Sequence, residues 1–324
     1  MNFSRFIRPA ALGTALLALA ASRAGAADPA KITLNVGVLK IAALADVYAA
    51  QQLGFFEKQG LEVVTTTANN GNDLITALES NRLDIALAIP GVAMQAREKG
   101  YKVSLVFQNE LAHATAPDTG ALIVRADSPI TTIKGLVGKK IAHSGIGTQA
   151  WAAVRAVEQK NNVDPASVTD LEISYPQMRS VLLQGQIDAV AVVDPFTSQI
   201  LNAKEGRVLS YFYVDSVPNQ PVGAFWATDE NMIKNKDAIR KFQVAMHQAL
   251  TYMSTHPTEA KKLIAEYTGL KPEFTAQMNP IRWSDKVNLG DWHRTAQMLV
   301  LTGATKTMSH VEDLIPKESM HPGE

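Results

Sequence analysis

Apolar and polar residues alternate at the start of the chain in a way that predicts a β-strand. Every second residue from Ile32 to Val38 is apolar, so these side chains would share one face of a strand over residues 31–39. A helical segment follows over residues 42–53. The same exchange of strand and helix patterns recurs along the chain, and it is typical of an α/β fold with mostly parallel strands.

The pattern places the remaining elements with the help of turn and cap residues. Further strands are predicted over residues 61–67, 83–89, 103–108, 120–125, 171–175, 187–193 and 223–228, with another around Ile141. Helices are predicted after the polar run 69–72, over 90–100, after Thr148, after Pro176 and after an Asp194 N-cap with Pro195 at the first helical position. Beyond Lys236 the chain is expected to be mostly helical, with breaks at Pro257, Pro272 and Pro280.

An internal repeat indicates two similar lobes. Residues 83–90 (LDIALAIP) resemble residues 187–195 (IDAVAVVDP), and each segment ends in a proline that opens a helix. We therefore predict that lobe 1 comprises residues 27–116 and 223–324, and that lobe 2, residues 117–222, is inserted into it. Ligands of open α/β sheets bind at the carboxyl ends of the strands, so two facing lobes would form a cleft.

The N-terminus has the features of a secretory signal peptide over residues 1–26. Arg5 and Arg8 precede an apolar run over residues 10–20, and Ala24-Gly25-Ala26 is a small-residue cleavage site. The alternative is a buried first helix. Cleavage after Ala26 would export the protein by general secretion, since no twin-arginine pair is present, and we expect a periplasmic location.

Composition and charge exclude several classes of function. The 324 residues contain no cysteine, which excludes disulfides, thiolate metal sites, a cysteine nucleophile and a lipid anchor on an N-terminal cysteine. Removing the three arginines of residues 1–26 leaves 28 basic against 31 acidic residues, a net charge of −3. No basic run stands out, so nucleic acid is not an expected partner. The histidines show no ligand spacing, and neither a metal nor a cofactor is expected.

Residues 144–149, here called the cradle, form a glycine-rich turn between a strand and a helix. Gly145 and Gly147 allow a tight turn, and Thr148 is a good N-cap. Such a turn directs backbone N–H groups at one point, which suits an anion or a polar group. Two alternatives remain, a plain helix start and a dinucleotide site. The dinucleotide site also needs an acidic residue after the next strand, where this chain has Ser174-Tyr175.

Four segments resemble the solute-binding proteins of bacterial ABC importers, in particular the nitrate, sulfonate and taurine binders that are related to the thiamine-pyrimidine synthases. They are residues 36–40 (VGVLK), 53–61 (LGFFEKQGL), 136–141 (LVGKKI) and 185–196 (GQIDAVAVVDPF). The resemblance implies a two-lobed type II periplasmic-binding-protein fold with a two-strand hinge, which closes over a ligand and docks on a membrane permease. By position it points to Lys40, to Pro90 and Gly91, to the cradle, and to Asp194 through Phe196. The chain lacks the cysteine-rich motifs of the synthases.

We therefore expect a monomeric, non-enzymatic binding component that delivers a small molecule to an ABC permease and its cytoplasmic ATPase. The expected ligand-binding residues are Lys40, Ile41, Leu44, Asn70, Asn72, Pro90, Gly91, Asn109, Ser144, Gly145, Gly147, Thr148, Gln149, Gln177, Asp194, Phe196 and Trp226. Several helix N-termini facing an apolar lining favour an organic sulfonate or carboxylate, with an aromatic body as one option. The alternatives are a neutral heterocycle such as a pyrimidine vitamin precursor, an exported enzyme, and a sensor subunit on the same scaffold.

Overall fold

The computed structural model describes Met1 and residues 31–307 and 311–320. The predicted signal peptide therefore lies, apart from Met1, outside the described residues. Residues from Lys31 onward belong to one compact unit. No helix in the described part of the chain is both long and apolar enough to cross a membrane.

Ten strands are described: β1 Ile32–Val38, β2 Leu61–Thr67, β3 Ile85–Leu87, β4 Val103–Leu111, β5 Gly120–Arg125, β6 Lys140–His143, β7 Thr169–Glu172, β8 Ala189–Val193, β9 Gly206–Ser210 and β10 Pro221–Thr228. The helices of the first half are η1 Ala42–Leu44, α1 Ala45–Gln52, α2 Phe55–Lys58, α3 Gly71–Glu79, α4 Pro90–Glu98, η2 Ile133–Leu136, α5 Gln149–Lys160 and η3 Pro165–Ser167. Those of the second half are α6 Tyr175–Leu183, α7 Phe196–Asn202, α8 Phe212–Ser216, α9 Asp229–Lys234, α10 Lys236–Thr255, α11 Pro257–Thr268, α12 Pro272–Ala276, α13 Leu289–Leu301, α14 Val311–Leu314 and α15 Lys317–Met320.

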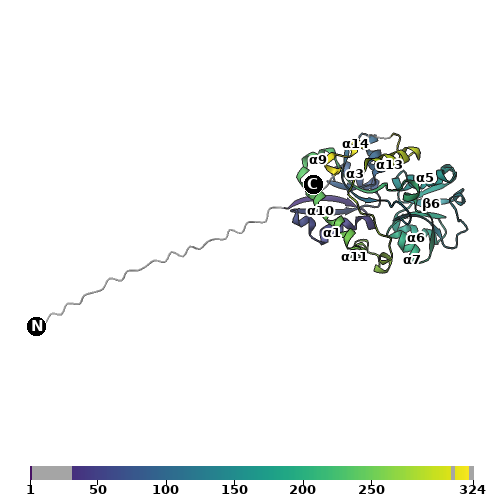
Figure 1. The fold of residues 1–324 in the computed structure, drawn as a ribbon, viewed down its shortest axis with the longest axis horizontal. Helices are drawn as coiled ribbons and strands as arrows, with labels where there is room; N and C mark the ends of the chain where they lie inside the picture. Colours follow the sequence, from purple (N-terminus) through teal and green to yellow (C-terminus); the bar gives the residue numbers. More distant parts are fainter. Residues whose placement is uncertain (2–30, 308–310, 321–324) are drawn as a thin grey trace. The chain divides into compact units, whose positions relative to one another are not determined.

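The strands form two five-stranded sheets with the same topology. The first has the order β2-β1-β3-β10-β4 and the second the order β7-β6-β8-β5-β9. The strands β1, β2 and β3 run parallel, as do β6, β7 and β8, while β10 and β5 are antiparallel to their neighbours. Figure 1 shows α5, α6 and α7 gathered around the second sheet, and α1, α3 and α10 around the first.

The same hydrogen bond, from a backbone N–H to an aspartate side chain, occurs in both sheets and confirms the internal repeat. The Asp84 Oδ2 accepts a hydrogen bond from the Asn35 N–H at 2.8 Å, which joins the start of β3 to the middle of β1. In the second sheet the Asp188 Oδ2 accepts from the Lys140 N–H at 2.9 Å, which joins β8 and β6. Both aspartates lie at the amino ends of their strands, so they hold the sheets together at the end away from the cavity described below.

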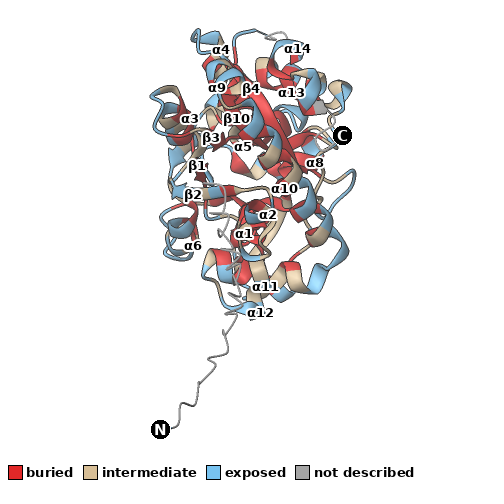
Figure 2. Cartoon of the chain, turned by 90° about the vertical axis from the view of Figure 1, so that its left-hand side faces the viewer, coloured by how far each residue is buried: buried red, intermediate tan, exposed pale blue. Residues whose placement is uncertain are grey.

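The core accounts for several differences between the predicted and observed elements. All nine residues of β4 are buried, and the strand continues to Leu111 instead of ending at residue 108 (Figure 2). The predicted strand 171–175 is β7, which ends at Glu172 because Tyr175 already starts α6. The predicted Asp194 N-cap is wrong by one residue: Pro195 occupies the cap position, and α7 starts at Phe196. Pattern reasoning missed α2, β9, α8 and α9 because each is short.

Candidate functional site

A cavity lies where the carboxyl ends of the two sheets meet. Its walls come from the residues after β1, β2 and β3 in one sheet and after β6, β7 and β8 in the other. The volume of the cavity is about 60 Å³ when the open solvent at its mouth is left out. This volume is well below the ~300–1,000 Å³ that is typical of ligand sites, so the walls lie close together in this structure.

The N-terminal segments of several helices reach the cavity, as the strand–helix alternation predicts. Ala42 comes from the start of η1, Gly71 from α3, Val92 from α4 and Ala150 from α5. Residues at the starts of α6 and α7 add Tyr175 and Asp194, which are described below. Apolar side chains cover much of the remaining wall, namely Leu39, Ile41, Ile89, Val193, Val222 and Ile281. The cavity therefore combines helix starts with an apolar lining.

The charged side chains of the described lining are two carboxyl groups, Glu110 and Asp194. Glu110 is the last residue but one of β4 and is 6% exposed, and Asp194 follows β8 and is 2% exposed. Burial is the main cause that raises the pKa of Glu110 to about 8 and that of Asp194 to about 7. No lysine, arginine or histidine is among the described residues that line the cavity.

Each carboxyl group has one oxygen engaged in a hydrogen bond. The Thr119 hydroxyl donates to the Glu110 Oε1 at 3.1 Å, and the Ser198 N–H donates to the Asp194 Oδ1 at 2.9 Å. The Asp194 Oδ2 is buried without a hydrogen-bond partner in the protein. An unpaired buried acceptor is costly, so this oxygen needs a proton or a donor.

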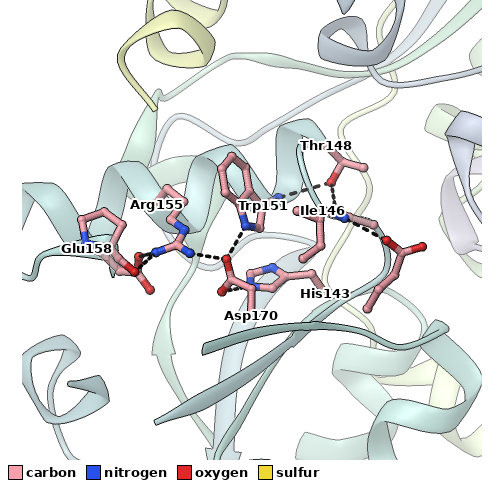
Figure 3. A network of polar contacts seen from close by, with 10 residues as sticks. His143, Ile146, Thr148, Trp151, Arg155, Glu158 and Asp170 are labelled. Carbon is pink, nitrogen blue, oxygen red and sulfur yellow. Dashed lines mark hydrogen bonds and ion pairs between the residues drawn. The ribbon is translucent and has the colours of Figure 1, made fainter. Parts of the chain in front are cut away.

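The cradle is held in shape by carboxylates of the neighbouring strand β7 (Figure 3). The Asp170 carboxylate accepts from the His143 Nε2 at 3.0 Å and from the Trp151 Nε1, and it pairs with Arg155. His143 directly precedes the cradle, and Trp151 lies two residues after its end. Two residues along β7, the Glu172 carboxylate accepts from the Ile146 N–H at 3.3 Å. Asp170 thus fixes both ends of the cradle, and Glu172 fixes its middle.

The local geometry of the cradle matches the sequence prediction. The Thr148 hydroxyl accepts from the Trp151 N–H at 3.4 Å, so Thr148 is the N-cap of α5. Gly147 has φ +75, a left-handed conformation that side chains rarely adopt. Gly145 has an ordinary φ, but a Cβ there would lie 2.8 Å from the Thr148 side chain. Both glycines are needed for different reasons.

Two glutamines connect the cradle to the first lobe. The Gln95 side chain on α4 donates to the Gly147 carbonyl at 2.6 Å and to the Ala304 carbonyl at 2.8 Å. The buried Gln149 Oε1 accepts from the Gly91 N–H at 3.3 Å. The Gln149 amide also donates to the Pro221 carbonyl at 2.7 Å, where the chain crosses back to the first sheet. In this structure the cradle of the second lobe is therefore in direct contact with the first lobe.

Five of the predicted ligand-binding residues line the cavity: Ile41, Asn70, Ser144, Thr148 and Asp194. Other predicted residues do not line the cavity, although each is next in sequence to a residue that does: Asn72, Pro90, Gly91, Asn109, Gly145, Gly147 and Gln149. Leu44 and Phe196 are buried in the core, and Gln177 is exposed on α6, where it accepts from the Ser174 hydroxyl. The apolar residues Ile89 and Val92 also line the cavity, whereas Ile146 is 42% exposed and Met178 is fully buried.

Lys40 and Trp226 have partners that explain why they do not line the cavity. The Lys40 ammonium lies 4.1 Å from the centre of the Tyr267 ring and donates to the Tyr267 carbonyl at 3.0 Å. Trp226 is fully buried on β10, donates to the Ala88 carbonyl at 2.8 Å and packs against Trp292. Lys40 therefore fastens α11 to the end of β1, and Trp226 belongs to the core of the first lobe.

Sequence reasoning left out several lining residues. Thr119, Tyr175, Tyr213 and Gly223 line the cavity but were not predicted to bind ligand. Thr119 and Gly223 lie at the crossovers, the two places where the chain passes between the lobes. The predicted lobe boundaries next to these residues could have indicated that they reach the cavity. Tyr213 lies on the short helix α8, which the pattern did not predict. Within the described residues, no group of three or more His, Asp or Glu side chains is arranged to hold a metal ion.

The family model described as NMT1/THI5 like matches residues 42–260, which is more than half of the chain. The chain belongs to this family. Its curated relatives include YtlA of Bacillus subtilis, 26% identical over 214 residues, which are 65% of this chain and 63% of that protein. The chain therefore covers less than two thirds of YtlA. A 4-amino-5-hydroxymethyl-2-methylpyrimidine phosphate synthase of Saccharomyces cerevisiae is 23% identical over 244 residues, 72% of this chain and 69% of the synthase.

A solved structure with the same fold is the alkanesulfonate-binding protein SsuA from Xanthomonas axonopodis pv. citri bound to MOPS. Its TM-score is 0.74 at 20% identity, over 90% of this chain and 99% of that chain. The NMT1/THI5-like chain thus has the two-lobed periplasmic-binding-protein fold, and the family resemblance drawn from the sequence is confirmed. The relatives of the chain include a putative binding protein and pyrimidine phosphate synthases, so family membership alone does not determine the activity or the ligand.

Proposed function

We propose that the protein is the substrate-binding component of an ABC importer, which captures a small organic molecule by closing its lobes. The observation that carries the proposal is the cavity between the carboxyl ends of the two sheets, with walls from both lobes. A ligand there contacts both lobes only when they are closed, so binding would shift the population towards the closed form. The closed form would then be recognised by a membrane permease.

The same proposal includes the domain division and the location of the protein. Lobe 1 would comprise residues 27–116 and 223–324, and lobe 2 residues 117–222, with the crossovers as the hinge. Strand membership supports this division, because β5 to β9 form the second sheet and the other strands form the first. Export by the signal peptide would place the monomer in a periplasm, where a permease of the inner membrane is accessible.

The cavity supports a neutral heterocycle over the organic anion that the sequence favoured. Helix N-termini suit an anion, but Glu110 and Asp194 are the charged groups of the described lining, and no base there offsets them. An added anion would have to keep both carboxyls protonated. A flat heterocycle with hydrogen-bond donors would satisfy the carboxyl oxygens and fill the apolar space beside Ile41, Ile89 and Ile281.

A thermal-shift screen of the mature protein tests the proposal. The panel contains aminopyrimidines, aromatic acids, alkanesulfonates, taurine and nitrate. A true ligand stabilises the folded state in proportion to the logarithm of its excess over the dissociation constant. We expect aminopyrimidines to raise the melting temperature most. A response to sulfonates or nitrate alone would reject the heterocycle as the ligand and would favour an anion instead.

An exported enzyme is the second candidate, because a yeast relative is a synthase and because two buried carboxyls with raised pKa values share one cavity. The discriminating measurement is turnover. The mature protein is incubated with each stabilising compound, which is then recovered and analysed by mass spectrometry. Quantitative recovery is expected of a binding protein. Conversion that is lost in Glu110→Gln would establish an enzyme.

A further inference from the structure

A second hollow, here called the α5–α13 groove, opens on the surface of the molecule. Its walls come from the end of α5, from residues 216–218 at the end of α8, and from α13. Figure 1 shows α13 beside α5, and the two helices are in contact. The volume of the groove is about 350 Å³, within the ~300–1,000 Å³ that is typical of ligand sites. None of its lining residues is shared with the cavity between the sheets.

The helices α5 and α13 run antiparallel along the groove. The Gln95 side chain donates to the carbonyl of Gly147, just before α5, and to that of Ala304, just after α13. The start of α5 therefore lies beside the end of α13. Lys160 is the last residue of α5 and Arg294 lies in the first half of α13, so both bases belong to the opposite end of the groove.

The wall from α13 is basic at that end and apolar further along. Its lining residues follow the i, i+3, i+4 spacing of one helix face, and the helix rises about 10 Å from Arg294 to Leu301. Met298 and Leu301 supply apolar surface, to which Ala156 and Val217 add from the other elements. Leu301 is 68% exposed, so a large apolar side chain is left open to an occupant.

The charged side chains of the described groove lining are the two bases Lys160 and Arg294. The Lys160 Nζ donates to the Asp215 and Ser216 carbonyls at 2.7 and 2.6 Å, which leaves one of its three N–H groups. Arg294 pairs with Asp291, but its side chain is 55% exposed and has further N–H groups to donate. The groove lining is thus basic, whereas the charged groups of the cavity lining are acidic.

We propose that the α5–α13 groove is a second ligand site, which takes an organic acid made of one carboxylate and an unbranched hydrocarbon chain. The carboxylate would accept hydrogen bonds from Lys160 and Arg294, and the chain would extend along α13 to Leu301. Charge-assisted hydrogen bonds at one end and burial of apolar surface at the other supply the affinity. The site is separate from the cavity, so the proposal does not depend on the proposed import function.

Octanoate, octanol, octylamine and acetate test the ligand class. The first three share one chain and differ in charge, and acetate has the charge without the chain. Each is titrated calorimetrically into the mature protein at pH 7, below the concentration at which it forms micelles. We expect octanoate to bind at least about tenfold more tightly than each of the other three. No binding of octanoate, or equal binding of octanol, octylamine or acetate, would overturn the proposal.

Photolabelling separates the groove from the cavity as the place where octanoate binds. An octanoate analogue with a diazirine at the end of its chain is bound to the mature protein, irradiated and located by mass spectrometry. We expect labels on residues 294–302, 216–218 or 156–160, and unlabelled octanoate should suppress them. Labels confined to segments that line the cavity would overturn the proposal.

The residue assignment is tested with Arg294→Gln and Leu301→Asn, both at exposed side chains. Each should weaken octanoate binding by about tenfold, through the lost ion pair or the lost apolar contact. The matched controls are Arg240→Gln on α10 and Ile233→Asn on α9, which are exposed outside the groove and should bind octanoate as wild type does. Unchanged affinity in both groove variants, or equal losses in the controls, would overturn the assignment.

A compound that the thermal-shift screen finds for the cavity should bind Arg294→Gln and Leu301→Asn with wild-type affinity, because neither residue lines the cavity. Parallel losses of octanoate and of that compound would place both in one site and contradict a second one. Absence of any cavity ligand would reject the proposed import function and leave the octanoate results to decide the groove.

Discussion

Asp170 on β7 binds His143 just before the cradle begins, with the His143 Nε2 3.0 Å from the Asp170 Oδ1. The same carboxylate binds Trp151 and Arg155 at the other end of the turn. Asp170 does not line the cavity, yet it determines where Ser144 and Thr148 can lie. It is a positioning residue for the wall of the second lobe.

We expect Asp170→Asn to lower the free energy of unfolding by about 3 kcal/mol, because it removes the carboxylate that pairs with Arg155 and accepts from the His143 and Trp151 side chains. Urea unfolding measures this change. Amide hydrogen exchange over residues 144–148 should become faster in the ligand-free protein, since the turn loses its anchor. This readout does not depend on the identity of the ligand.

Asp188→Asn is the control for the cradle. The Asp188 side chain accepts one backbone N–H at the opposite end of β6, so its loss should cost about 1 kcal/mol and leave exchange in the cradle unchanged. Equal acceleration of cradle exchange in both variants would show that Asp170 acts through general stability alone.

Gly147→Val should weaken ligand binding more than it lowers stability. A β-branched residue at φ +75 has a strained backbone, which should lower the free energy of unfolding by about 1–3 kcal/mol. Gly147→Asn keeps a residue that tolerates the left-handed region, and it should retain most of the binding. Thermal unfolding with and without a ligand found in the screen measures both effects. A folded Gly147→Val variant with wild-type affinity would show that the cradle is not part of the binding site.

The stability of the wild-type protein should fall as the pH rises from about 5 to 9, and Glu110→Gln should reduce that fall. The pKa of Glu110 is raised from 4.5 in the reference state to about 8 in the fold, so above pH 4.5 the unfolded chain releases a proton that the folded chain keeps. The stabilisation by the protonated group is therefore complete below pH 4.5 and lost as the pH passes 8.

Gln preserves the acceptor for Thr119 but cannot ionise. The difference in unfolding free energy between wild type and Glu110→Gln should reach a few kcal/mol, on the order expected for a buried carboxyl, when pH 9 is compared with pH 5. Urea unfolding at the two pH values measures it. Parallel pH profiles of the two proteins would mean that Glu110 is ionised in the fold.

Gln95→Ala should open the ligand-free protein. The Gln95 side chain links α4 to the cradle and to the Ala304 carbonyl, so its removal takes away a contact that favours closed lobes without ligand. Small-angle scattering should show a larger radius of gyration for the variant, and a tight ligand should restore the compact form. Gln186→Ala removes an exposed side chain whose amide donates to the Gln184 side chain in the same turn, and this variant should behave as wild type. An unchanged radius in all samples would argue against the hinge.

Local patterns in the sequence were sufficient for the parallel strands, the repeat and the cradle. The alternation of residues 32–38, the Asp84 and Asp188 turns and the Thr148 cap depend on contacts within or between neighbouring segments, whose periods and cap chemistry are short-range. Family membership followed from the same segments. Short elements such as α8 and β9 were missed because too few residues carry their pattern.

Only the tertiary structure decided which of the residues near the strand ends reach the cavity. Lys40 and Asp194 both follow strands of the repeat, yet Lys40 turns outward onto Tyr267 and Asp194 lines the wall. That difference depends on α11, which lies more than 200 residues from Lys40 in sequence and supplies the competing ring and carbonyl. The acidic character of the cavity likewise depends on how the two lobes bring Glu110 and Asp194 together, since the net charge of the chain is nearly balanced. Periodicity determines which face a residue occupies, but the partner that a side chain finds there is set by packing between distant segments.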